Sequence, residues 1–364
     1  MTRALDLRTI QSVRESDLDV SSFRPVRAIL ASEFWPGATA RGIVPGLRDA
    51  GWLVDEIDIR QYVPPGHDLR SRVEGRLRNR ERVSAFQRAI LASAQVHDPA
   101  VFLTVKGIAL RQATLAALRQ RGTFLVNYYP DRDVAMDHAH PYDLFVTTKS
   151  YQLDYLRREL GPTRVHYVPH GYAEGMHRPL PTTESEREND ILYIGNANAE
   201  KAALLSALTS AMPNRRIKII GSGWDKIARG AALHCAIIGS SFHGDYYAAE
   251  IARAKIVLAF HWGANPKTGL ADLVSTRSFE IPACGGFMLH IDNGEIRSLY
   301  DVPSEIDTFV SPEELIAKCL YWLANPVERQ AVAARGHARA VPAYSYFERG
   351  RELARLVEER LENR

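Results

Sequence analysis

The sequence alternates between short runs rich in β-branched residues and longer segments with the apolar spacing of helices. This alternation is typical of α/β proteins, in which helices connect the strands of a parallel sheet. The runs form two series, and we predict a strand for each: residues 26–31, 52–59, 100–105, 123–129, 143–148 and 164–170, then 191–194, 216–220, 256–260, 287–291 and 307–310. Two α/β domains in tandem are therefore predicted.

A polar, proline-containing stretch separates the two series. RPLPTTESEREND, residues 178–190, breaks the alternation and indicates a linker. The 364 residues also suit two domains. We place an N-terminal domain at 1–177 and a C-terminal domain at 191–343, and we expect a final helix over about 344–364.

Composition argues against several classes of protein. A net charge of +3, from 46 basic and 43 acidic residues, is too small to indicate a nucleic-acid binder. Cys235, Cys284 and Cys319 have neither the spacing of a zinc site nor that of a disulfide framework. We find no apolar leader and no run of about 18 apolar residues, so we expect a cytoplasmic protein without a membrane span.

The segment 70–91 combines apolar residues at helical spacing with many arginines. We expect a solvent-exposed amphipathic helix here. The alternatives are peripheral contact with a membrane surface, an acidic partner or nucleic acid.

Ligands of open α/β sheets bind beyond the carboxyl ends of the strands. Gly195 and Asn196 follow one such strand, and Gly195 either lets the backbone approach a phosphate or only makes the turn. Gly221 and Ser222 follow the next strand. Trp224 then either stacks on a base or packs in the core, which is the more common use of an indole.

Arg277 and Glu280 precede the turn Cys284-Gly285-Gly286. We predict a helix that starts near Glu280 and ends at these glycines, which shape the turn. A carboxylate there can accept hydrogen bonds from a ribose diol, and Arg277 can hold a diphosphate bidentately. The alternative is a surface ion pair between the two side chains.

The run DRDVAMDHAHPYDLF follows the strand predicted at 123–129. If the chemistry requires a base that deprotonates a hydroxyl group, Asp131, nearest the strand end, is the first candidate and His138 the second. Helix-capping aspartates are the alternative. Two D-x-D triplets, at 17–19 and 131–133, both lie in the N-terminal half.

Three further positions lie where a cleft is expected. Gly37, in SEFWPGATARG after the first strand, allows close approach of a ligand, and Trp35 beside it either stacks on a sugar or, more commonly, packs in the core. His170 either contacts a ligand or only forms the hinge turn. His261, after 256–260, either binds phosphate or sugar or is a structural histidine.

Several motifs, in order, resemble CgeB-like (spore maturation type) glycosyltransferases, which belong with the GT-B glycosyltransferases. They are Tyr193-Ile194-Gly195-Asn196, Ile220-Gly221-Ser222-Gly223-Trp224, HGDYYAAEIARAKIVLAFH, the RSFE…ACGG element, the junction VPHGYAEGMHRP and the C-terminal helix. The resemblance covers roughly residues 120–355. It implies two Rossmann-like domains with parallel sheets facing a central cleft, the second binding the donor and the first the acceptor, and a final helix that packs back on the first domain.

The resemblance also implies roles for residues. Glu280 matches the second position of an E-x7-E donor motif, the residue that holds the ribose, while Asp272 stands at the first position in place of Glu. Lys201 is the nearest match to the basic residue that neutralises the diphosphate, and Arg277 is the second candidate. Because these cations can stabilise the leaving group and both D-x-D triplets lie outside the donor domain, we expect no metal and no cofactor.

The expected activity is transfer of a sugar from a UDP-, GDP- or dTDP-sugar to an acceptor hydroxyl, with retention or inversion left open. The alternatives are a nucleotide-sugar epimerase or hydrolase on the same fold, or a catalytically silent sugar- or nucleotide-binding protein of envelope or spore assembly.

Overall fold

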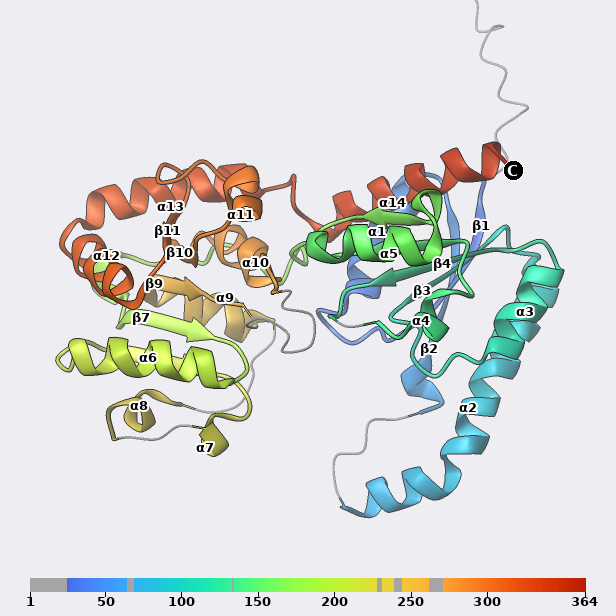
Figure 1. Cartoon of the computed structure of the whole chain (residues 1–364), viewed down its shortest axis with the longest axis horizontal. Helices are drawn as coiled ribbons and strands as arrows, with labels where there is room; N and C mark the ends of the chain where they lie inside the picture. The colour runs from blue at the N-terminus through green and yellow to red at the C-terminus, as the bar shows by residue number, and fades with distance from the viewer. Residues whose placement is uncertain (1–24, 64–68, 133, 228–230, 239–243, 262–270) are drawn as a thin grey trace, which may run out of the picture.

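The computed structural model describes residues 25–364 apart from 64–68, 133, 228–230, 239–243 and 262–270, and side chains of 69–78 and 231 are also outside the description. The chain forms two lobes that lie side by side, each built on its own sheet (Figure 1). Each strand predicted from the sequence is confirmed, with ends that differ by a few residues.

The first sheet has six parallel strands in the order β2-β1-β3-β4-β5-β6. They are β1 (Arg27–Ser32), β2 (Leu53–Asp58), β3 (Val101–Val105), β4 (Phe124–Tyr129), β5 (Leu144–Thr147) and β6 (Val165–Tyr167). Their helices are α1 (Thr39–Asp49), α2 (Leu69–His97), α3 (Gln112–Gln120), α4 (Met136–Ala139) and α5 (Leu153–Leu160). Successive residues alternate between two cores, with Leu103 in one and Phe102 in the other, because helices cover both faces of the sheet.

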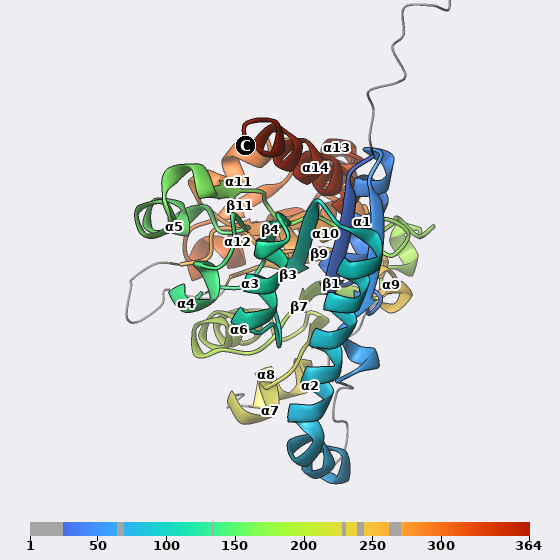
Figure 2. The ribbon, with the colours of Figure 1, turned by 90° about the vertical axis from the view of Figure 1, so that its right-hand side faces the viewer.

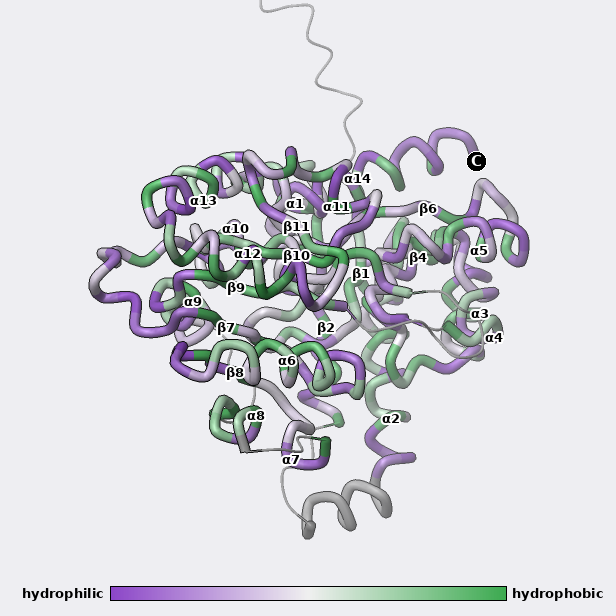
Figure 3. Tube along the Cα trace, turned by 60° about the vertical axis from the view of Figure 1, so that its left-hand side comes forward, coloured by the Kyte–Doolittle hydropathy of each residue, from purple (hydrophilic) through white to green (hydrophobic). Residues whose placement is uncertain are grey.

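The second sheet has five parallel strands in the order β11-β10-β9-β7-β8. They are β7 (Asn189–Ile194), β8 (Ile217–Ile220), β9 (Ala254–Ala259), β10 (Met288–Ile291) and β11 (Asp307–Phe309). The helices of this lobe are α6 (Ala199–Ala211), α7 (Trp224–Ile227), α8 (Ala231–Ala236), α9 (Asp245–Ala252), α10 (Arg277–Ala283), α11 (Gly294–Leu299), α12 (Pro312–Ala324) and α13 (Pro326–Ala340). The hydrophobic residues of β9 and β10 lie inside this lobe (Figure 3).

The last helix, α14 (Tyr346–Glu362), returns to the first lobe and lies along α1 (Figures 1 and 2). The two helices touch backbone to backbone, since a Cβ on Gly46 would lie 2.0 Å from the carbonyl oxygen of Phe347. The chain thus passes twice between the lobes. The two passages are joined by hydrogen bonds from the amide of Tyr172 to the carbonyl of Tyr344 and from the amide of Tyr346 to the carbonyl of Tyr172.

Helix α2 contains the arginine-rich segment, and its N-terminal end extends away from the rest of the molecule (Figure 2). Farther along, Phe86, Ile90 and Ala94 pack it against the first sheet. The alternative of contact with a membrane surface, an acidic partner or nucleic acid stays open, because some of the side chains that would make it lie outside the described residues. No helix in the described part of the chain is long and apolar enough to cross a membrane.

Candidate functional site

One cavity of about 380 Å³ lies between the two lobes and is lined by residues that follow strands of both sheets. In the first sheet β1 lies between β2 and β3, and in the second β7 lies between β8 and β9, so each sheet reverses its strand order at that strand. Crevices open at such reversals, beyond the carboxyl ends of the strands. Residues after β1, β3, β4 and β7 meet here, together with the start of α10.

Arg277 brings a positive charge to the C-terminal side of this cavity. Its Nη2 donates to the carbonyl oxygen of Phe260 at 2.9 Å, and its guanidinium lies 5.8 Å from the ring centre of Tyr193. Gly195 leaves room for this side chain, because a Cβ there would lie 3.0 Å from Nη1. Nε is buried without a hydrogen-bond partner, and no carboxylate of the described residues forms an ion pair with the guanidinium. The site therefore holds a cation with an unused donor.

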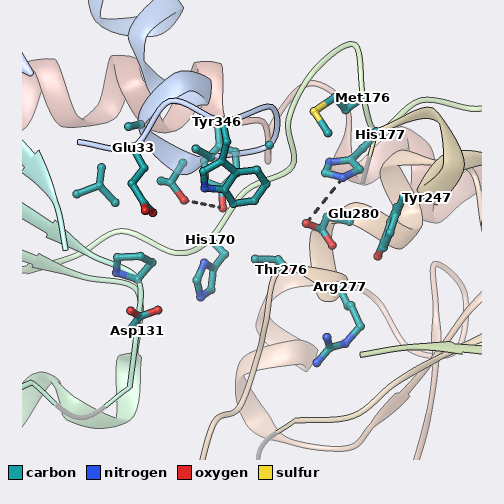
Figure 4. Close-up of a pocket in the computed structure, with 18 of the residues that line it drawn as sticks. Glu33, Asp131, His170, Met176, His177, Tyr247, Thr276, Arg277, Glu280 and Tyr346 are labelled. Carbon is teal, nitrogen blue, oxygen red and sulfur yellow. Dashed lines mark hydrogen bonds and ion pairs between the residues drawn. The ribbon is translucent and has the colours of Figure 1, made fainter. Parts of the chain in front are cut away.

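Glu280 lies on the same side and faces His177 (Figure 4). Oε1 of Glu280 is 3.8 Å from Nε2 of His177, whose Nδ1 accepts a hydrogen bond from the amide of Ala173. Tyr247 packs edge-on against His177, and burial raises the pKa of its hydroxyl well above the usual value. The helix begins at Arg277, not near Glu280, and the surface ion pair considered as an alternative does not form.

Gly195 and Asn196 line the cavity, whereas Gly221, Ser222 and Trp224 lie behind them. The amide of Ser222 donates to Oδ1 of Asn196. Trp224 is 1% exposed and its Nε1 donates to the carbonyl of Gly195 at 2.9 Å. Its ring is thus not available for base stacking in this structure, and the alternative of an indole packed in the core is the one observed.

Lys201 also supports the cavity from behind and is not part of its lining. This third residue of α6 is 3% exposed, and its Nζ donates to the carbonyl of Asn196 at 3.1 Å. Burial, and then the positive charge of Arg277, lower the pKa of Lys201 to about 7. A bound anion would favour the protonated form.

Carboxylates lie on the N-terminal side of the cavity, where Figure 4 shows Glu33 and Asp131 opposite Arg277 and Glu280. Oδ2 of Asp131 is 3.0 Å from Nζ of Lys106. Lys106 has φ +69°, an uncommon conformation for a residue other than glycine that is concentrated at functional sites. The structure thus places Asp131 on the N-terminal side of the cavity, opposite Arg277.

His138, the second candidate base, is not in this cavity. It lines a neighbouring cavity of about 430 Å³, together with Tyr129 and Tyr142, and the two cavities share only Lys106 and Asp131. The loop after β4 therefore separates the two candidates, because Asp131 directly follows the strand and His138 belongs to α4.

Gly37 and Trp35 form part of the wall next to the linker. Gly37 has φ +90°, and a Cβ there would lie 3.0 Å from the Trp35 ring and 3.3 Å from the methyl group of Met176. Trp35 is partly exposed at the cavity and is not one of the buried core residues, which differs from the more common use of a tryptophan expected from the sequence.

His170 lines the cavity from the chain segment that follows β6. The side chain is 5% exposed, and its Nε2 lies 3.1 Å from Oγ1 of Thr148 and 3.2 Å from Nζ of Lys149. Burial, and next the charge of Lys149, hold the pKa of His170 well below its usual value. The ring is therefore neutral.

Asp272 lies outside the cavity lining. Its Oδ1 is 3.2 Å from Nζ of Lys149 and accepts a hydrogen bond from the hydroxyl of Tyr151 at 3.1 Å. Asp272, which the resemblance places at the first position of the donor motif, thus joins the two lobes in this structure, and its contact with a donor sugar stays a prediction.

His261 follows β9 and likewise is not a lining residue. Its ring lies 4.7 Å from that of His290, and burial holds its pKa well below the usual value. Both ring nitrogens are buried without a hydrogen-bond partner among the described residues. The neighbouring segment 262–270 lies outside the description.

No group of three His, Cys, Asp or Glu side chains suited to a metal ion occurs in the described part of the chain. Of the two D-x-D triplets, residues 17–19 and Asp133 lie outside it. Independence from metal ions thus stays a prediction.

The sequence analysis missed four residues with a place in this site: Glu33, Lys106, Lys149 and His177. Three of them could have been found, because Glu33 and Lys106 come directly after strands and Lys149 follows one by two residues. His177 had no such signal, since only the fold brings this residue, which directly precedes the linker, to Glu280.

Comparison with known proteins agrees with this geometry. Residues 200–355 match the model of a family described as glycosyl transferase-like. Spore protein CgeB of Bacillus subtilis (strain 168) is 24% identical over 205 residues, a match that covers 52% of this chain and 61% of that protein. The chain thus spans less than two thirds of this curated relative.

Two solved structures share the architecture at low sequence identity. Sucrose-phosphate synthase from Thermosynechococcus elongatus has a TM-score of 0.64 at 14% identity, covering 94% of this chain and 100% of that chain. HepE from Anabaena, solved in complex with UDP, has a TM-score of 0.57 at 11% identity, covering 92% of this chain and 100% of that chain. Residues 200–355 are thus similar to glycosyl transferase-like proteins, this chain is similar to CgeB over about half of its length, and its two-lobed fold is shared with these solved structures.

Proposed function

We propose that this protein transfers a sugar from a nucleoside diphosphate sugar to an acceptor hydroxyl. The observation that carries the proposal is a cavity at which strand ends of both sheets meet, with carboxylates on one side and, on the other, a guanidinium that forms no ion pair with any carboxylate of the described residues. A diphosphate leaving group gains negative charge as its bond to the sugar breaks, so a fixed cation aimed at it lowers the barrier.

The donor fits the C-terminal side by charge and shape. Nε of Arg277 has no hydrogen-bond partner among the described residues, and Gly195, which lines the cavity, leaves room for the guanidinium. Glu280 can accept hydrogen bonds from a ribose diol. A nucleoside diphosphate is also the ligand named for HepE, which supports UDP as the first compound to test. Arg277 and Lys201 supply positive charge, so we propose that the reaction needs no metal ion.

The acceptor fits the N-terminal side. Asp131 lies at the boundary between the two cavities, so an acceptor in the second cavity can direct its hydroxyl toward a donor sugar in the first. In an inverting reaction Asp131 is the base. In a retaining reaction no protein base is required, and Asp131 only orients the acceptor.

Thermal denaturation with a panel of nucleoside diphosphates and nucleotide sugars tests the proposal. A ligand at a hundredfold its dissociation constant adds about 2.7 kcal/mol to the free energy of unfolding. We expect one nucleotide to raise the melting temperature of the wild type and not that of Glu280→Ala. If no compound in the panel does so, the proposal fails.

A donor that binds is then incubated with the protein and candidate acceptors. A transferase gives a new glycoside, whereas an epimerase or hydrolase changes the nucleotide sugar without an acceptor. A protein that only binds leaves the donor intact.

A further inference from the structure

Buried polar groups connect the two lobes beside the cavity. Asp272, from the C-terminal lobe, contacts Lys149, from the N-terminal lobe, and Lys149 contacts His170. The side chains of Asp272 and Lys149 are 5% and 6% exposed. An ion pair this deeply buried is costly to separate, so it holds Lys149 in place.

Lys149 determines which nitrogen of His170 carries the proton. Its Nζ lies 3.2 Å from Nε2, and an ammonium group can donate a hydrogen bond but cannot accept one. Nε2 must therefore offer its lone pair. Thr148 does not decide the tautomer, because its hydroxyl has a single proton and Oγ1 lies 3.1 Å from both the carbonyl oxygen of Pro130 and Nε2. Since the ring is neutral, its proton is on Nδ1.

Among the described residues, Nδ1 of His170 has no partner for that proton. It is buried and makes no hydrogen bond to any described residue, while the side chain lines the cavity. Figure 4 shows the ring between Asp131 and Thr276, in the middle of the cavity. A buried N–H without an acceptor is costly, and a ligand oxygen would satisfy it where binding moves aside the groups that cover Nδ1.

We propose that Lys149 and Asp272 are positioning residues that hold His170 in the Nδ1–H tautomer, and that His170 donates this hydrogen bond to an oxygen of a bound nucleoside diphosphate or its sugar. The identity of the ligand rests on the proposed function, whereas the tautomer does not. Because Asp272 comes from the opposite lobe, His170 is prepared for the ligand only when the lobes are in contact, and by reciprocity the ligand strengthens that contact.

The tautomer can be measured without a ligand. In protein with ¹⁵N-labelled histidine, long-range ¹H–¹⁵N spectra distinguish protonated from unprotonated ring nitrogens. We expect a proton on Nδ1 of His170 and, as an internal reference, on Nε2 of His177, whose Nδ1 accepts from a backbone amide. The His170 signal is assigned by its absence from the spectrum of His170→Gln. If that variant does not fold, the signal is assigned by its shift in Thr148→Ser. A proton on Nε2 of His170 in the wild type overturns the proposal.

Variants then test the two positioning residues. Lys149→Met should move the proton to Nε2, where it can be donated to Thr148, and Asp272→Asn should shift the population in the same direction. Glu295→Gln is the matched control, because Glu295 accepts hydrogen bonds from Ser150 and Tyr167 of the other lobe without touching His170. The proposed role of Lys149 is contradicted if the ring proton of His170 stays on Nδ1 in Lys149→Met. It is also contradicted if Glu295→Gln moves the proton as much as Lys149→Met does. If Lys149→Met does not fold, the wild-type spectrum decides.

UDP is the probe for the ligand. Its addition should shift the Nδ1–H signal of His170, and Lys149→Met should bind UDP about tenfold or more weakly than Glu295→Gln. If UDP binds without moving this signal, His170 does not contact it and that part of the proposal is wrong. If UDP and the nucleotide panel fail to bind at all, the proposed function and the ligand contact fail, while the tautomer is still decided by the ligand-free spectrum.

Discussion

Replacing Arg277 with methionine should separate ligand binding from stability. The change removes a hydrogen bond to the carbonyl of Phe260, worth about 1 kcal/mol, and the contact over the Tyr193 ring, worth about 0.5–1 kcal/mol. It also removes a partly buried cation that no carboxylate of the described residues neutralises, and methionine retains the apolar contacts of the side-chain stem. These effects oppose each other, so we expect the free energy of unfolding to change by less than about 1.5 kcal/mol.

The effect on ligand binding should be much larger. The proposed function assigns Nε and Nη1 of Arg277 to a diphosphate, and hydrogen bonds to charged groups contribute about 1.5–3 kcal/mol each. The loss of two such bonds amounts to about 3–6 kcal/mol, which weakens UDP binding by at least about a hundredfold.

Calorimetric titration with UDP and ligand-free chemical denaturation measure the two effects. Arg187→Met is the matched control, because the Nη1 of Arg187 donates to the carbonyls of Ala252 and Ala254 and its Nε pairs with Glu184 at 3.5 Å, away from the cavity. The control should lose stability and keep its affinity for UDP. Our reasoning is refuted if Arg277→Met loses more than about 3 kcal/mol of stability while its affinity stays within about threefold of the wild type.

Three further outcomes are expected. Burial lowers the pKa of Lys201 from 10.5 to about 7, so between these pH values the unfolded chain holds more protons than the folded protein, and the free energy of unfolding should rise with pH. Denaturation of Lys201→Met across this range should show a smaller rise, and an unchanged slope would contradict the assigned pKa. Gly46→Ala should lower the melting temperature, because its Cβ would lie 2.0 Å from a carbonyl oxygen of α14, whereas Gly294→Ala meets nothing within 4 Å and should have little effect. If the reaction is inverting, Asp131→Asn should slow transfer by about 10²–10⁴-fold with UDP affinity unchanged, and full activity of this variant in an inverting reaction would exclude Asp131 as the base.

The elements of this fold could be predicted because their signals are local. Each strand is a short apolar run, and Pro312 to Ala324 reads as a helix from its own residues, with Ser311 as N-cap. The rule that ligands bind after strands also led to residues that line the cavity, among them Asp131 and Gly195.

Side-chain partners depend on contacts between distant parts of the chain, and only the tertiary structure decided them. Asp272 forms an ion pair with Lys149, which is 123 residues earlier, and so joins the two lobes. Trp224 is buried because its indole N–H reaches the carbonyl of Gly195, which no local pattern indicates. The sequence by itself thus determined which segments become strands and helices and which residues follow them, since these depend on neighbours in the chain. The packing of two lobes decided which of those residues share one cavity.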